Sequence, residues 1–355
     1  MGATGSGKTS FINAGSGSNL RVGTNLKSCT AKVQLADEFI LDGRHIILVD
    51  TPGFDDTHKS DTDILKLIAA FLATTYENGF KLAGVIYIHR ISDKRFTGIA
   101  GRNFRMFREL CGDSTLKNVI LVTNMWGEVS PDVGEAREQE LVGEFLEPAL
   151  TKGAQLARHH NTAKSAHDII RRIMRNRPIP LQIQRELVDE HKDIIDTAAG
   201  ETINKELKEQ IRHHQVELDA VREDMLRALE EKDEETRQEL EEETRKIQEE
   251  MNKMRMDSEG MAANYNEEKR RMEEAMRQMQ EQARQERERA EAEHRRQMED
   301  LNERLQRSTN ASATERAALL QKINELNELE SWRGRTVCGS GRSRGPGITI
   351  TCLIM

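Results

Sequence analysis

The chain has 355 residues, of which 32% are charged and only 4% aromatic, and its net charge is −8. The length allows two domains, but the composition is too polar for one compact globule, so it predicts a globular part joined to a solvated helical part. The negative charge argues against nucleic acid as a partner. Four widely separated cysteines indicate reduced thiols, and we expect a cytoplasmic location.

A phosphate-binding motif opens the chain. Residues 2–9 read Gly-Ala-Thr-Gly-Ser-Gly-Lys-Thr and match the P-loop pattern G-x-x-x-x-G-K-[ST]. Backbone N–H groups of such a loop surround phosphates, while Lys8 reaches the β- and γ-phosphates and the Thr9 hydroxyl coordinates Mg²⁺. The nucleotide-binding residues predicted here are Gly2, Thr4, Gly5, Ser6, Gly7, Lys8, Thr9 and Ser10.

The position of this motif is unusual, because a P-loop ordinarily follows a buried strand and only Met1 precedes it here. The first helix is expected over Ser10–Ala14. The first strand of the sheet is therefore missing from the sequence, and we expect either a truncated chain or a reading frame that starts further upstream. That strand would be central in the sheet, so its absence would affect stability.

Strands and helices alternate over residues 1–180, which we assign to a nucleotide-binding G domain. Apolar runs predict strands at 44–50, 82–88 and 117–123, and helical spacing predicts a helix over 61–76. This alternation is typical of an α/β fold, a doubly wound and mostly parallel sheet with helices on both faces. Two prolines, Pro178 and Pro180, mark the domain edge.

Residues 181–330 have a different composition, rich in Glu, Arg, Gln and Lys. Apolar residues recur there three and four apart, as in Leu218, Val221 and Met225, and predict a coiled coil interrupted near Gly260 and Ser308, through which the chain would self-associate as a homodimer. The alternative is one solvated helix stabilised by ion pairs. Residues 331–355 form a predicted flexible basic tail.

A second phosphate motif, Asp50-Thr51-Pro52-Gly53, ends the predicted strand at 44–50. An acid at this place can hold Mg²⁺, and the Gly53 N–H can sense the γ-phosphate. Together with the P-loop it predicts a nucleotide-hydrolase site of the GTPase type. A switch threonine must complete the Mg²⁺ shell, and spacing favours Thr30 over Thr24; either could be a turn or strand residue.

The stretch Leu48–Thr57 resembles the septin-like (paraseptin) GTPases, a group that includes immunity-associated nucleotide-binding proteins and chloroplast import-receptor GTPases. The string Tyr87–Asp93, with Met106-Phe107, Met125-Trp126 and Arg158-His159, is similar to the fungal G-domain proteins of that group. The resemblance covers about residues 2–175. It implies a P-loop GTPase fold, GTP or GDP with Mg²⁺, and a homodimer formed through the G domain.

The base-recognition motif departs from this group. GTPases usually read guanine with N-K-x-D, but the matching site is Asn124-Met125-Trp126-Gly127, so the acid is absent, although Glu128 is adjacent. Trp126 could stack on the base or pack in the core. Ser165 resembles the last base-contacting loop of the group, or it could start a helix.

The catalytic residue is left open by the sequence. Phe54 follows Gly53, so no glutamine orients water there and slow hydrolysis of GTP to GDP and phosphate is expected. Related import GTPases carry an arginine near Arg90 that is directed at a partner subunit. Arg90 could act in trans in this way, or it could simply pair with Asp93.

The last four residues, Cys352-Leu353-Ile354-Met355, fit the C-a-a-X pattern for prenylation of Cys352. Basic residues upstream would add attraction to a membrane, so a cytosolic membrane face is expected. The leading functional hypothesis is a slow, nucleotide-switched GTPase with a coiled-coil stalk. The alternatives are a pseudo-GTPase scaffold that acts through its coiled coil, and an ATP-using protein with a long coiled coil.

Overall fold

The structure, a computed structural model, describes residues 1–22, 32–54, 59–94, 98–231, 234–307, 318, 320–324 and 351–354. It divides into one unit of Met1–Arg270 with Thr351–Met355 and a second unit of Arg271–Ile350. Thr30 and Thr24, the candidate switch threonines, lie outside the described residues, as do the basic residues of the tail.

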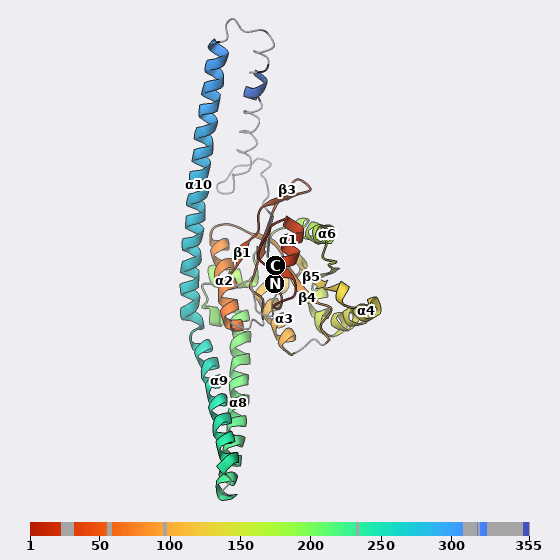
Figure 1. The fold of residues 1–355 in the computed structure, drawn as a ribbon, viewed down its shortest axis with the longest axis vertical. Coiled ribbons are helices and arrows are strands. Elements are labelled where there is room, and N and C mark those ends of the chain that lie inside the picture. The colour runs from red at the N-terminus through yellow and green to blue at the C-terminus, as the bar shows by residue number, and fades with distance from the viewer. Residues whose placement is uncertain are drawn as a thin grey trace. The chain divides into compact units, whose positions relative to one another are not determined.

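The elements follow each other along the chain as the alternation predicted (Figure 1). The strands are β1 (Gln34–Leu35), β2 (Phe39–Leu41), β3 (Arg44–Asp50), β4 (Leu82–Arg90), β5 (Val119–Asn124), β6 (Gln155–Arg158) and β7 (Thr351–Ile354). The helices are α1 (Lys8–Ser16), α2 (Asp61–Glu77), α3 (Gly98–Cys111), α4 (Pro131–Glu140), α5 (Glu147–Leu150), α6 (Ala163–Met174), α7 (Gln182–Gln184), α8 (Ala198–Glu231), α9 (Glu234–Glu259) and α10 (Met261–Arg307).

The strands form one sheet in the order β1-β3-β7-β4-β5-β6, with β2 also paired to β3. Neighbouring strands from β3 to β6 are parallel, while β1 and β2 run antiparallel to β3. The predicted α/β fold class is therefore confirmed. The place between β3 and β4 is taken by β7, from the far end of the chain, which the sequence analysis did not anticipate.

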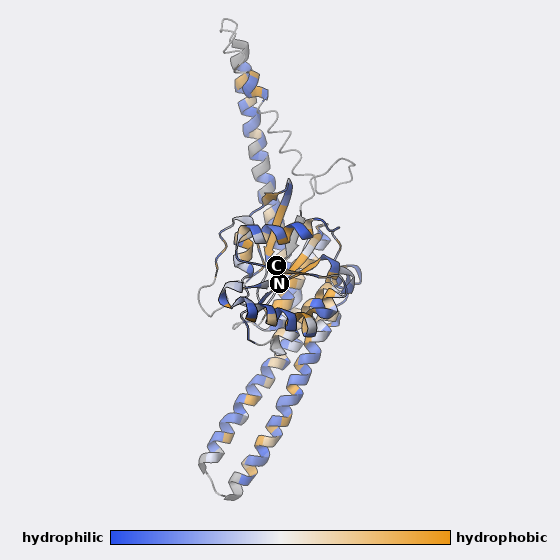
Figure 2. Cartoon of the chain, turned by 90° about the vertical axis from the view of Figure 1, so that its right-hand side faces the viewer, coloured by the Kyte–Doolittle hydropathy of each residue, from blue (hydrophilic) through white to orange (hydrophobic). Residues whose placement is uncertain are grey.

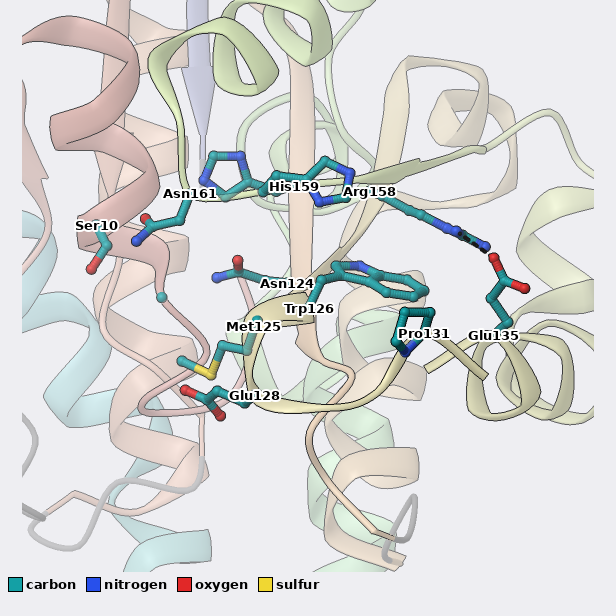
Figure 3. A pocket seen from close by; sticks show the side chains of 13 residues that line it. Ser10, Asn124, Met125, Trp126, Glu128, Pro131, Glu135, Arg158, His159 and Asn161 are labelled. Atoms are coloured by element: carbon teal, nitrogen blue, oxygen red, sulfur yellow. Dashed lines mark hydrogen bonds and ion pairs between the residues drawn. The ribbon is translucent and has the colours of Figure 1, made fainter. Parts of the chain in front are cut away.

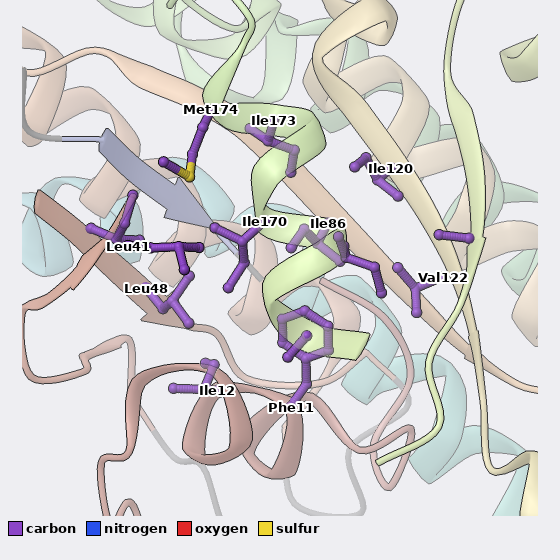
Figure 4. Close-up of a cluster of buried hydrophobic side chains, with 14 of the residues drawn as sticks. Phe11, Ile12, Leu41, Leu48, Ile86, Ile120, Val122, Ile170, Ile173 and Met174 are labelled. Carbon is purple, nitrogen blue, oxygen red and sulfur yellow. The ribbon is translucent and has the colours of Figure 1, made fainter. Parts of the chain in front are cut away.

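Helices cover the sheet because successive side chains of its buried strands point to opposite faces. On one face, Ile86 of β4 packs in a cluster with Phe11 and Ile12 of α1 and Ile170 of α6 (Figure 4). On the other face, Tyr87 lies with its ring centroid 4.7 Å from that of Phe107 in α3. Figure 2 shows the contrast between these apolar strands and the mostly hydrophilic long helices.

Helices α8 and α9 pack against each other within the chain. Ser258 hydrogen-bonds to Asn204 and His214 lies 3.7 Å from Glu250, so the two helices run antiparallel. Leu218 of the predicted apolar seam in α8 and Met251 of α9 are both only 4% exposed. A single solvated helix is therefore excluded for this segment, since its seams meet in an intramolecular hairpin.

The helix break predicted near Gly260 is present, because α9 ends at Glu259 and α10 begins at Met261. The other predicted break, near Ser308, lies outside the described residues. In the described part of the chain, no helix combines the length and apolar character that crossing a membrane requires.

Gly84 of β4 offers a test of how closely the sheet and its covering helix pack. A Cβ at this position would lie 2.6 Å from Cγ2 of Ile173 in α6 and would also collide with the Asn118 carbonyl oxygen. We expect Gly84→Ala to lower the free energy of unfolding by about 1–3 kcal/mol, the usual cost of overpacking a core. Urea denaturation followed by circular dichroism measures this change.

The matched control is Gly143→Ala, because a Cβ there meets nothing within 4 Å. This variant should be neutral, or more stable by up to about 1 kcal/mol, since alanine is the better helix former. Equal losses in the two variants would contradict the packing described for β4.

Candidate nucleotide-binding site

The P-loop wraps around the start of α1. Gly5 and Gly7 adopt positive φ angles of 76° and 92°, a region that favours glycine, and Gly7 is the N-cap residue of α1. The loop therefore presents N–H groups of the first helical turn to one point, where the helix dipole adds positive potential. An anion is the natural ligand of such a loop.

Lys8 folds back over this loop. Its side chain is buried, and its Nζ donates to the carbonyl oxygens of Gly2 at 3.0 Å and Ala3 at 2.9 Å. The ammonium group is thus held inside the loop, beside the N–H groups that would contact phosphate. A buried cation of this kind is well placed to pair with an anionic ligand.

Thr9 and Asp50 lie together at the end of β3. The Thr9 hydroxyl donates to Asp50 Oδ2 at 2.7 Å, and the Asp50 side chain is fully buried. A hydroxyl and a carboxylate are the hard oxygen ligands that Mg²⁺ prefers, and Mg²⁺ sites beside phosphates usually include only one or two carboxylates. These two residues therefore fit the ion that the sequence predicted there, while Thr30 falls outside the described residues.

The second phosphate motif contacts the P-loop through its main chain. Thr4 N–H donates to the Phe54 carbonyl at 2.8 Å, and Phe54 N–H donates to the Gly2 carbonyl at 3.2 Å. A Cβ on Gly53 would lie 2.6 Å from the Thr4 nitrogen, so this close approach requires glycine. The structure thus brings Asp50 and Gly53 to the loop, as their spacing predicted.

Asn124, at the end of β5, anchors the other side of the loop. Its Nδ2 donates to the Ser6 carbonyl at 3.0 Å, and its side chain is buried. A Cβ on Gly7 would collide with that same amide group. Asn124 therefore fixes the position of the loop relative to β5, a contact that the sequence did not predict for it.

A cavity of about 650 Å³ opens beside the end of the P-loop (Figure 3). Its size falls in the range of small-molecule sites. The residues that line it come from the P-loop and α1, from the segment after β5, from α4 and from the segment after β6: Gly7, Ser10, Asn124, Met125, Trp126, Gly127, Glu128, Pro131, Glu135, Arg158, His159, His160 and Asn161. Ser10, Asn124 and Trp126, all predicted nucleotide contacts, lie in this lining.

Trp126 forms part of the cavity wall and is held on several sides. Its Nε1 donates to Thr123 Oγ1 at 3.1 Å, and the Arg158 guanidinium carbon lies 4.2 Å from the centre of its ring. A Cβ on Gly134 of α4 would lie 2.7 Å from its Cζ3 atom. A cation–π contact and α4 thus hold the half-buried indole in the cavity wall.

Arg158 is in turn held by acids of α4. Its Nε donates to Glu138 at 2.9 Å and its Nη1 lies 3.3 Å from Glu135, the pair marked in Figure 3. Glu138 also accepts a hydrogen bond of 2.9 Å from Thr123 Oγ1. These contacts connect the ends of β5 and β6 through one polar network and make the wall rigid.

His159 lies buried at the inner end of the cavity. Its ring centroid is 4.7 Å from that of Phe11, and its Nδ1 pairs with Ser165 Oγ at 2.9 Å. Burial, followed by the neighbouring charge of His160, lowers the pKa of His159 to about 4, so the ring is neutral near pH 7. Within the described residues its Nε2 has no hydrogen-bond partner.

Ser165 lies in the first turn of α6, whose N-cap residue is Thr162. With Thr162 it forms the capping box of α6. The cavity lining includes His159, His160 and Asn161. Ser165 contacts this lining through its hydrogen bond with His159. The sequence analysis missed these lining residues because β6 is four residues long and half polar; their only signal is that they follow a strand, at the edge of the sheet where β5 also ends with Asn124.

Arg90, the predicted catalytic residue, lies at the end of β4 beside its own P-loop. Its Nη1 is 3.3 Å from the place where a Cβ on Gly5 would stand. Its Nε also pairs with Asp93 at 3.1 Å, and about a third of each side chain is exposed. The ion pair anticipated from the sequence is present, and it holds the guanidinium near the loop of the same chain.

A family model described as 50S ribosome-binding GTPase matches residues 1–125. None of the curated proteins matches the chain. Toc33 from Arabidopsis thaliana, solved in complex with GDP and Mg²⁺, is 15% identical over 51% of this chain and 85% of that one, with a TM-score of 0.41. The bacterial selenocysteine-specific elongation factor EF-Sec is 14% identical over 49% of this chain and 27% of that one, with a TM-score of 0.36.

The translation elongation factor SelB from Methanococcus maripaludis is also 14% identical, over 50% of this chain and 34% of that one, with a TM-score of 0.33. The matched residues 1–125 hold the phosphate loop at their start and strands β1 to β5 of the sheet, and their fold resembles that of a P-loop GTPase domain.

Proposed function

We propose that this chain binds GTP with Mg²⁺, hydrolyses it slowly to GDP and phosphate, and acts as a nucleotide-dependent switch or assembly module with a helical stalk. The observation that carries the proposal is the contact between Thr9 and Asp50, 2.7 Å apart, which joins the P-loop to the second phosphate motif. The resemblance to septin-like GTPases supports guanine as the base and a homodimer as the working form.

Residues of this chain would take defined roles when nucleotide is bound. Thr9 and Asp50 would hold Mg²⁺, which neutralises charge on the phosphates. Lys8 would exchange its present acceptors, the carbonyls of Gly2 and Ala3, for phosphate oxygens. The N–H groups of the loop and of Gly53 would bind the remaining oxygens.

The cavity beside the loop is the place for the ribose and base. Guanine recognition cannot use the usual carboxylate, because Gly127 occupies that position. Glu128 lines the same cavity, and it is the acidic side chain that we propose accepts from the guanine N1–H and amino groups. The other lining acid, Glu135, is already paired with Arg158.

One specific observation favours the alternative, a pseudo-GTPase scaffold. Phe54 stands where many GTPases carry the glutamine that orients water, and its side chain is fully buried. No group of this residue can therefore assist hydrolysis, and α8 and α9 would carry the function in a protein that never turns over. Intact phosphate motifs argue against this alternative.

We also propose that Cys352 is prenylated and brings the protein to a cytosolic membrane face. A single prenyl chain binds membranes only marginally, so a homodimer or the basic residues of the tail would strengthen attachment. The support is the C-a-a-X pattern of the last four residues.

Nucleotide binding tests the main proposal. We expect the purified full chain to bind GTP–Mg²⁺ in preference to ATP–Mg²⁺, and Lys8→Ala to weaken GTP binding about 10- to 100-fold. Such a loss corresponds to one hydrogen bond to a charged group, worth about 1.5–3 kcal/mol. Isothermal titration calorimetry measures both quantities.

The matched control is Lys164→Ala, an exposed lysine near the start of α6, which should bind GTP as the unaltered chain does. Absence of binding by the folded, unaltered chain would leave only the scaffold. Tighter binding of ATP than of GTP would overturn guanine as the preferred base.

Hydrolysis tests the role of Arg90. If its guanidinium stabilises transferring phosphate, Arg90→Ala should slow single-turnover GTP hydrolysis at least ~10-fold, toward the ~10³- to 10⁵-fold effect of an arginine finger. Because Arg90 lies beside its own loop, the rate per molecule should not change with protein concentration. A rate that rises with concentration would assign Arg90 to the partner's site instead.

Asp93→Asn is the informative control for this experiment, since it removes the ion pair and keeps the arginine. The variant should retain the hydrolysis rate. If Asp93→Asn and Arg90→Ala lose activity equally, the pair is structural and Arg90 has no catalytic part.

Lipidation is tested in cells. Mass spectrometry of the expressed full chain should find a prenyl thioether on Cys352, and Cys352→Ser should abolish the modification and the membrane-bound fraction. An unmodified cysteine in a cell that prenylates other C-a-a-X proteins would refute this part of the proposal.

A further inference from the structure

Strand β7 occupies the middle of the sheet, although it comes from the last described residues of the chain. Thr351–Ile354 pair in parallel with Ile46–Val49 of β3 on one side. Cys352, Leu353 and Ile354 pair with Leu82, Gly84 and Val85 of β4 on the other side. The sheet therefore contains a slot between β3 and β4 that accepts a parallel strand, and this segment fills it.

Residues 1–3 extend the strand formed by β7 along the same edge of β4. The N-terminal ammonium of Met1 donates a hydrogen bond to the Ile86 carbonyl, and the Met1 carbonyl accepts from Ile88 N–H at 2.8 Å. Ala3 then forms a bridge with Phe54. Because β7 ends beside Val85, the edge of β4 is covered by β7 and then by residues 1–3, and the two chain ends lie side by side in Figures 1 and 2.

This composite strand leads directly into the P-loop, and the two halves of the nucleotide site lie on opposite sides of it. Asp50, which holds Thr9, ends β3 on one side. Asn124, which holds Ser6, ends β5 beyond β4 on the other side. Without β7, main-chain N–H and C=O groups of β3 and β4 would face an unfilled slot, and buried groups left unpaired are costly.

We propose that the slot between β3 and β4 is a binding site for a parallel β-strand, that residues 351–354 of this same chain are its occupant, and that their insertion holds the two halves of the nucleotide site together. The main-chain hydrogen bonds supply affinity, as in other cases of strand addition. The C-terminal segment is thus a structural part of the GTPase domain rather than only a candidate lipid anchor.

The lipidation proposed above would compete with this strand insertion. This competition, unlike the strand site itself, rests on that proposal. Prenyl transfer forms a thioether between Cys352 Sγ and the prenyl carbon, releases diphosphate from the prenyl diphosphate, and gives the thiol proton to solvent. Hydrolysis of the peptide bond after Cys352 then removes residues 353–355 with one water. The processed chain has lost Leu353 and Ile354, so membrane attachment and strand insertion exclude one another.

The test compares three nucleotide-free full-length proteins: the unaltered chain, a chain lacking residues 353–355, and Cys352→Ser, which keeps the main chain of β7. Amide hydrogen exchange followed by mass spectrometry reports on peptides covering β3 and β4. We expect exchange there to accelerate at least tenfold in the shortened chain and to stay unchanged in Cys352→Ser. A synthetic peptide of residues 348–355 added to the shortened chain should restore protection.

If the shortened chain is insoluble, Leu353→Pro takes its place, because proline removes one ladder hydrogen bond from the middle of a strand. Unchanged exchange in β3 and β4, or failure of the peptide to restore it, overturns the proposal. Protection that depends on protein concentration overturns it too, by assigning the strand to a second copy. All these readings are made without nucleotide, so a failure of GTP binding leaves them unaffected.

Discussion

The phosphate-binding loop depends on being held from two strands that do not touch each other. Thr9 is tied to Asp50 at the end of β3, and Ser6 is tied to Asn124 at the end of β5. The main chain of Phe54 adds a third attachment. Because these anchors lie on separate strands, the geometry of the loop is only as stable as the sheet that connects them. Strand β7, which lies between β3 and β4, therefore contributes to the geometry of the loop although it has only four residues.

Two buried charged side chains, Lys8 and Asp50, lie at the phosphate-binding loop. Lys8 is only 6% exposed and Asp50 is fully buried, and burying charges is costly unless they are paired. Carbonyls of Gly2 and Ala3 accept from Lys8, and the Thr9 hydroxyl donates to Asp50. In the function proposed above, a triphosphate would lie against Lys8 and Mg²⁺ against Asp50, so each buried charge would face an opposite charge of the ligand.

The sequence predicted those parts whose signals are local. Strand β3 was predicted with its observed bounds because an unbroken apolar run ends in an acid, and the P-loop because its pattern is long. Strand β6 was missed, since four residues, two of them polar, are too few to show an alternation of apolar and polar side chains. The cavity residues that follow β6 were missed for the same reason. Strand β7 could not be predicted: its partners are some 300 positions away, and the same aliphatic residues also fit a lipidation motif.

Ion pairs join α8 and α10 to helices α3 and α2 of the sheet-containing unit. Glu206 of α8 pairs with Arg105 of α3 at 3.2 Å, and Lys269 of α10 pairs with Glu77 of α2 at 2.7 Å. The apolar seams of α8 and α9 are already used within the chain, so a homodimer would need another surface. In the switch proposed above, a displacement of α2 would reach α10 through the contact between Glu77 and Lys269.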